Sequence, residues 1–239
     1  MSEHITRKEL KQDKIKETFE HGAEALFSHR ALTLIVLLVI LAVVGSWSVW
    51  RIYTDRQTVH ASAAFNEALK VYGARLGPAD ASQPGEPAFP DEASRSSAAQ
   101  QKFAQAADRY PHNYYGRLSR YYSALCLLDS DRLNQALEEL KKIGDTGDPE
   151  ITAISRYQTA VIYARSGRTD EAVKIYRTLA DQRSVLVPRP MVLLELANTL
   201  RSSNTGEAVK VYEQVKTEFP NSAVADEADK GMSTISPKS

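Results

Sequence analysis

Three alanines stand at the same point of a repeating helical pattern, 36 residues apart each time: Ala136, Ala172 and Ala208. Apolar residues follow them at offsets of one, four and seven residues, which form one face of a helix. A small residue at the same place in every helix lets neighbouring helices approach closely. Units of this kind bury a core only by stacking, so the chain is predicted to form an α-solenoid whose long surface suits recognition better than catalysis.

The predicted fold class is all-α. Between residues 98 and 235 helical patterns alternate with short polar turns, and no segment shows the two-residue alternation of a strand. We therefore expect a helical repeat domain over 98–235, closed by a more polar capping helix. Residues 51–76 are predicted to form a connecting helix that also supplies the first repeat helix. Residues 77–97 hold four prolines, which indicates a flexible insertion.

The apolar run 31–50 contains no ionisable side chain in 20 residues. A helix of that length spans about 30 Å, so we predict one transmembrane helix. Trp47, Trp50 and Tyr53 lie at its end, where aromatic rings favour the headgroup region. A buried core helix and a cleaved signal peptide are the alternatives. The charged tail 1–30 is longer and more acidic than the basic start of a signal peptide, which favours a retained anchor.

Basic residues predict the orientation of this helix. The 15 residues before the run and the 15 after it each hold two basic residues, but the rest of the tail adds Arg7, Lys8, Lys11 and Lys14. This favours a cytoplasmic N-terminus and a C-terminal domain across the membrane. The single cysteine, Cys126, can form no intramolecular disulfide and lies in an apolar run. We expect a packed core thiol, with a reactive thiol as the alternative.

Catalytic and metal-binding motifs are absent from the sequence. The five histidines show no ligand spacing and no cysteine partner, and the glycines are spread through turns instead of forming a phosphate-binding loop. Thirty basic and 30 acidic residues give a net charge of zero, so no nucleic acid partner is implied. We expect no enzyme activity, cofactor, metal or small-molecule substrate.

Residues 153–180 resemble a tetratricopeptide repeat almost position by position, with Ala160 and Tyr163 on the first helix, Gly167 in the turn, and Tyr176 on the second helix. The resemblance implies that the first helix of each pair lines a concave surface that binds protein. Projected onto this chain, the surface carries Leu118, Tyr121, Leu125, Leu128 and Asp129, then Ile154, Tyr157, Val161 and Arg165, then Leu193, Ala197 and Arg201.

That surface is largely apolar and would suit an amphipathic helix or an extended apolar peptide, with Tyr121 and Tyr157 as anchors. The alternative is that several of its aliphatic residues pack helix against helix. Repeats that clamp a C-terminal carboxylate carry Lys and Asn at these positions. This chain has neither residue there, which argues against a carboxylate clamp.

The order of the parts also resembles one family. A charged tail, one anchor, the segment Ala-Ser-Ala-Ala-Phe-Asn-Glu-Ala-Leu at 61–69 and about three repeats are similar to the YfgM-type family of bacterial anchored tetratricopeptide proteins. This resemblance implies a single-pass protein of the bacterial inner membrane with a periplasmic repeat domain. It would be an ancillary subunit of the Sec translocon, with translocon subunits, a periplasmic chaperone or secreted clients as partners. A structural adaptor of envelope or cell-division machinery and a holdase-like chaperone remain as alternatives.

Overall fold

The computed structural model describes residues 30–77, 87–144 and 147–235. The chain divides into two units, Met1–Arg56 and Gln57–Ser239. Apart from Arg30, the predicted charged tail lies outside the described residues.

The first unit is described by the N-terminal part of α2 (Arg30–Tyr72). Its large apolar side chains are exposed, between 48% for Val36 and 68% for Val49. In the described part of the chain this is the one helix long and apolar enough to cross a membrane. A membrane span and a signal sequence both fit a helix of this kind near an N-terminus.

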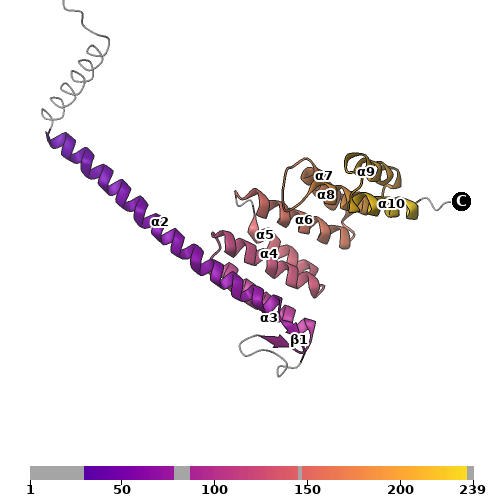
Figure 1. Cartoon of the computed structure of the whole chain (residues 1–239), viewed down its shortest axis with the longest axis horizontal. Coiled ribbons are helices and arrows are strands. Elements are labelled where there is room, and N and C mark those ends of the chain that lie inside the picture. Colours follow the sequence, from indigo (N-terminus) through magenta and orange to yellow (C-terminus); the bar gives the residue numbers. More distant parts are fainter. Residues whose placement is uncertain (1–29, 78–86, 145–146, 236–239) are drawn as a thin grey trace, which may run out of the picture. The chain divides into compact units, whose positions relative to one another are not determined.

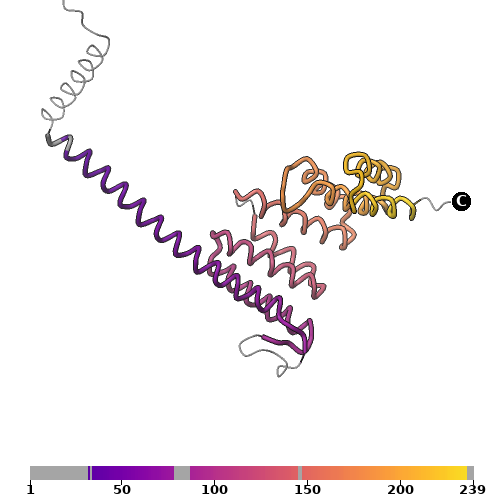
Figure 2. The backbone as a smooth tube through the Cα atoms, in the orientation of Figure 1, coloured from indigo at the N-terminus to yellow at the C-terminus, as the bar shows by residue number. Residues whose placement is uncertain are grey.

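The second unit is a stack of helices, each packed on the next along the chain (Figures 1 and 2). After the C-terminal part of α2, the helices are α3 (Glu92–Arg109), α4 (Tyr114–Asp129), α5 (Leu133–Ile143), α6 (Pro149–Arg165), α7 (Thr169–Ala180), α8 (Arg189–Leu200), α9 (Thr205–Glu218) and α10 (Ala223–Ile235). We call α4, α6 and α8 the first helices, and α5, α7 and α9 the second helices, of three successive pairs. The predicted α-solenoid is confirmed.

Ahead of the predicted repeat domain 98–235, a short strand β1 (Arg75–Leu76) pairs in parallel with β2 (Ala88–Phe89). Strands of two residues are too short to show an alternating pattern in the sequence. Helix α3 begins at Glu92, inside the predicted insertion 77–97. Asp91 caps it by accepting a hydrogen bond from the backbone N of Ser94 at 2.7 Å. Residues 78–86 of that insertion lie outside the described residues.

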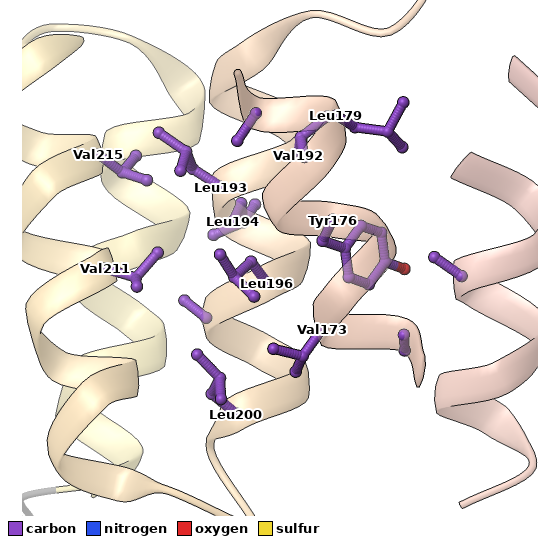
Figure 3. Packing of buried hydrophobic residues seen from close by; sticks show 14 of the residues in the cluster. Val173, Tyr176, Leu179, Val192, Leu193, Leu194, Leu196, Leu200, Val211 and Val215 are labelled. Atoms are coloured by element: carbon purple, nitrogen blue, oxygen red, sulfur yellow. The ribbon is translucent and has the colours of Figure 1, made fainter. Parts of the chain in front are cut away.

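The repeated alanines lie where the pairs pack most closely. Ala136, Ala172 and Ala208 are each 0% exposed, on α5, α7 and α9. Around Ala172 and Ala208, larger side chains from α7, α8 and α9 form one core cluster, of which Figure 3 shows Tyr176, Leu196 and Val211, and Ala136 belongs to a second cluster. Helices with small residues at their contact approach closely enough for such cores to leave little empty space.

Aromatic rings join the part of α2 from Gln57 onward to α3 and α4. Phe103 of α3 is 0% exposed, and its ring centroid lies 5.8 Å from Phe65, 6.2 Å from Tyr72 and 5.2 Å from Tyr122. Lys102 and Glu67 add a surface ion pair at 2.6 Å. The C-terminal part of α2 therefore packs as the first layer of the stack.

Candidate protein-binding face

Four side chains, one each from α4, α6, α8 and α10, are near enough for each to affect the pKa of the next across the stack. They are Tyr121, Tyr157, Glu195 and Glu227, which we call the inner row. Burial raises the pKa of Tyr121 to about 12. Burial also raises the pKa of Tyr157 to about 12, with contributions from the charge of Glu195 and from Tyr121. The four helices thus bring together residues that are up to 106 positions apart in the sequence.

A buried ring supports the middle of the inner row. The ring of Tyr157 lies 5.9 Å from that of Tyr176 at an interplanar angle of 65°, an edge-to-face arrangement. Tyr176 is 0% exposed, and its hydroxyl points away from Leu196 in Figure 3. Burial, followed by the charge of Glu195, raises the pKa of Tyr176. Packing on a fixed ring holds Tyr157 in place, so its exposed part is preorganised for a ligand.

Glu195 is a half-buried carboxylate without a cation. In the part of the chain that the structure describes, its oxygens form no hydrogen bond and no salt bridge. Burial raises its pKa, and the like charge of Glu227 raises it further. Partial burial of an unpaired charge costs free energy, which a cation from a partner would recover.

The residues predicted from the sequence fall into three groups. Those that remain partly accessible are Leu118, Tyr121, Leu125, Tyr157 and Val161. Those that are core residues are Leu128, Ile154, Leu193 and Ala197, at 7%, 8%, 3% and 0% exposure. Those that are exposed are Asp129, Arg165 and Arg201. Leu193 is buried because α8 packs against α7, α9 and α10, so it has little surface to offer a partner.

Two of the three exposed residues bind within the chain. Arg165 pairs with Asp131 at 2.8 Å, and Arg201 donates to the hydroxyl of Thr234 at 3.3 Å. Burial and the charge of Glu92 raise the pKa of Asp129. The accessible apolar and aromatic residues of the predicted surface lie on α4 and α6, and α8 contributes Glu195 instead.

Sequence reasoning missed Glu195 and Glu227. One signal was present, because Glu195 is the single charged residue in the apolar segment Met191–Ala197. A charge that interrupts an apolar helix is costly unless it faces solvent or a partner.

A hollow of about 940 Å³ lies elsewhere, between α7 and the turn from α8 to α9. Its walls include Arg177 and Glu207, which form a salt bridge with each other. Because these charges are already paired, this hollow is a weaker candidate for protein binding than the inner row.

Cys126 is a packed core thiol, as predicted. It is 1% exposed, and burial raises its pKa to about 12. The thiolate is the reactive form, so this cysteine has little nucleophilic character near neutral pH. Among the residues that the structure describes, no cluster of three or more His, Cys, Asp or Glu side chains could hold a metal ion.

Comparison with known proteins gives matches over most of the chain. A family model described as a tetratricopeptide repeat-like domain matches residues 28–183, and a second, described as a tetratricopeptide repeat, matches residues 191–222. No curated protein sequence matches.

Two crystal structures of Podosopora anserina "putative kinesin light chain nearly identical TPR-like repeats" are similar in fold. One of them, a point variant, has a TM-score of 0.51 at 17% identity, over 59% of this chain and 77% of that one. The other has a TM-score of 0.50 at 16% identity, with the same coverage. At these identities the likeness concerns the fold alone.

Proposed function

We propose that this chain, which belongs to the tetratricopeptide repeat-like domain family, is a membrane-anchored scaffold that binds a protein partner along its inner row. The observation that carries the proposal is the half-buried Glu195, which forms no salt bridge with any described residue and whose charge acts on Tyr157, a tyrosine packed on the buried ring of Tyr176. Aromatic side chains with one apolar face and one polar tip are common anchors of protein interfaces. Stacked repeats present them along an extended surface.

The chemistry of the inner row indicates the kind of partner. Tyr121 and Tyr157 offer apolar ring surface, and Glu195 with Glu227 offers negative charge at one end. A matching segment would carry apolar side chains followed by a lysine or arginine. The cation would lie over the carboxylates, where its charge gives orientation and specificity. An amphipathic helix or an extended peptide can supply this pattern.

The anchor in this proposal is the apolar part of α2. The family match begins at residue 28, ahead of the apolar run, so that run belongs to the matched region. Its exposed apolar side chains need a nonaqueous environment, which a bilayer provides. An anchored scaffold meets membrane partners at high effective concentration, so modest contacts along the inner row would suffice.

For the cellular setting we propose the bacterial inner membrane, with the repeat domain in the periplasm near the Sec translocon and periplasmic chaperones. The support is the larger number of Lys and Arg residues on the N-terminal side of the apolar run and the resemblance of the chain's layout to the YfgM-type family. The location is tested with a cysteine placed in the stretch 77–97 of a Cys126→Ser variant. Labelling of intact cells by an impermeant thiol reagent is expected, and labelling only after lysis would place the domain in the cytoplasm.

Binding along the inner row is tested by partner capture from cells. Tyr157→Ala and Glu195→Gln should each weaken capture, by roughly 10-fold or more for the tyrosine if it is an interface hot spot. Matched controls are Tyr114→Ala, an exposed tyrosine of α4 outside the row, and Glu213→Gln, an exposed glutamate of α9. Equal capture by the row variants and the controls would place the binding site elsewhere.

A photo-crosslinking residue at position 121 distinguishes the remaining alternatives. One stoichiometric product is the result expected for a scaffold. Many heterogeneous products would instead favour a holdase-like chaperone.

A further inference from the structure

The loop between α7 and α8 holds two aliphatic side chains out into solvent. Val185 is 84% exposed and Leu186 is 51% exposed. In the described part of the chain no other large apolar side chain is as exposed as Val185, including those of the apolar run. Two adjacent aliphatic side chains at a loop tip form a small apolar patch without a partner of its own.

This loop has a defined conformation, because a carboxylate from another helix holds it. Glu150, in the first turn of α6, accepts hydrogen bonds from the Ser184 hydroxyl at 2.7 Å and the backbone N of Leu186 at 2.9 Å. It also accepts from the backbone N of Val185 at 3.1 Å. These bonds, that to Leu186 first, lower the pKa of Glu150. Beneath the tip, Val187 is 2% exposed. The exposed pair is therefore fixed in place.

The loop lies at the edge of the stack where α2 enters. Each short turn reverses the chain, so the first helices α4, α6 and α8 all begin at one edge, as the tube in Figure 2 lets the reader follow. Asn113, the cap of α4, donates to the hydroxyl of Thr58 at 2.9 Å, which places the beginning of α4 beside the Gln57 end of α2. The bonds from Glu150 place the beginning of α6 beside the 184–187 loop.

Chain length brings this edge within reach of a bilayer. The apolar run ends at Trp50, and the second unit begins at Gln57, seven residues later. Seven residues span at most about 25 Å, in whatever direction they run. If the apolar run lies in a membrane, the Gln57 end of this edge is thus kept within about 25 Å of the lipid headgroups.

The charges around the loop also suit a lipid surface. Arg183 is exposed directly before the loop tip. The charge of Glu150 is engaged by the loop's own donors. Arg189 pairs with Glu218. Among the described residues Arg183 forms no hydrogen bond or ion pair, and such an arginine beside aliphatic side chains matches anionic headgroups above an apolar layer.

We propose that Val185 and Leu186 dip into the lipid surface, with Arg183 at the headgroups, so that this edge of the repeat domain rests on the membrane. The proposal rests on the anchoring proposed above. The contact would fix how the domain stands on the bilayer and therefore where the inner row can meet a membrane partner.

The test uses the full-length Cys126→Ser chain in vesicles of phosphatidylethanolamine and phosphatidylglycerol. A single cysteine at position 186 carries an environment-sensitive fluorophore. The matched control carries it at Ser203, an exposed residue in the turn at the other end of α8. We expect blue-shifted emission at position 186, with strong quenching by lipid-borne nitroxides, and neither effect at position 203. A Val185→Asp change should remove the quenching at position 186 while the helical circular dichroism stays unchanged.

Quenching of the 186 label by aqueous iodide alone would overturn the lipid contact. A blue shift without nitroxide quenching would also overturn it, since a protein surface would then cover the loop. Alkaline extraction of the same vesicles separates this failure from that of the anchor. Release of the chain would refute the anchor and the contact together, whereas a retained chain with a water-exposed label would refute the contact alone.

Discussion

Replacing Phe103 with alanine should loosen the first layers of the stack and leave the last ones folded. Phe103 is 0% exposed and lies against rings of α2 and α4 at centroid distances of 5.2 to 6.2 Å. Truncation of a buried phenylalanine to alanine costs about 3–5 kcal/mol. The three neighbouring rings are rigid and cannot easily move into the space that is left. We therefore expect the free energy of local unfolding to fall by about 4 kcal/mol, which raises the equilibrium constant for local opening close to a thousandfold.

The loss should be local, because stacked repeats contact only their neighbours. Hydrogen–deuterium exchange of the full chain in detergent measures directly which helices are destabilised. Amides of residues 57–72 and 92–109 should exchange up to about a thousandfold faster, and those of α8 and α9 should change little. The matched variant is Val215→Ala, also 0% exposed but on α9, which should accelerate exchange in α8 to α10 instead.

Two results would refute this reasoning. Uniform acceleration over the whole stack in both variants would mean that the array unfolds as one cooperative unit. A decrease of less than about 1 kcal/mol in the free energy of local unfolding would mean that the aromatic cluster does not hold the C-terminal part of α2 in the stack.

Three further changes follow from single contacts. Gly116→Ala should strongly lower the urea midpoint, because a Cβ on Gly116 would overlap the carbonyl oxygen of Tyr110; an unchanged midpoint would show that the corner between α3 and α4 yields easily. Arg120→Met should lower the free energy of unfolding by about 2–4 kcal/mol, because it removes the 2.8 Å ion pair with the mostly buried Glu139. Adding Glu139→Leu should recover part of this stability in the same urea titration. Cys126 should stay unmodified by a maleimide in mildly alkaline buffer and react once the chain is unfolded in urea, as mass spectrometry would show; rapid labelling of the native chain would contradict its burial and its pKa of about 12.

Helix content and stacking could be predicted from the sequence because both depend on short-range spacing. The alanines 36 residues apart and the apolar offsets around them are local patterns, and a face with that spacing can be buried only against another helix. The partly accessible tyrosines Tyr121 and Tyr157 were predicted from the same repeat spacing. The resemblance to a tetratricopeptide repeat indicated that residues at these positions line the concave surface.

The sequence was less informative about positions whose roles depend on contacts between distant residues. Projection of the repeat register placed Leu193 on the binding surface, but the packing of α8 buries it, and the residue of α8 whose charge acts on Tyr157 is Glu195. The start of α3 was missed because four prolines nearby outweighed the cap at Asp91.

The sequence alone determined that this chain has one long apolar run and a stack of helical pairs, because hydrophobic periodicity needs no knowledge of neighbours. Tertiary structure decided which side chains remain for a partner. Glu150 reaches a loop 34 to 36 residues away, and among the described residues no helix around Glu195 supplies a cation for it. Burial and pairing are properties of a residue's neighbours in space, and those are set by the packing of the helices.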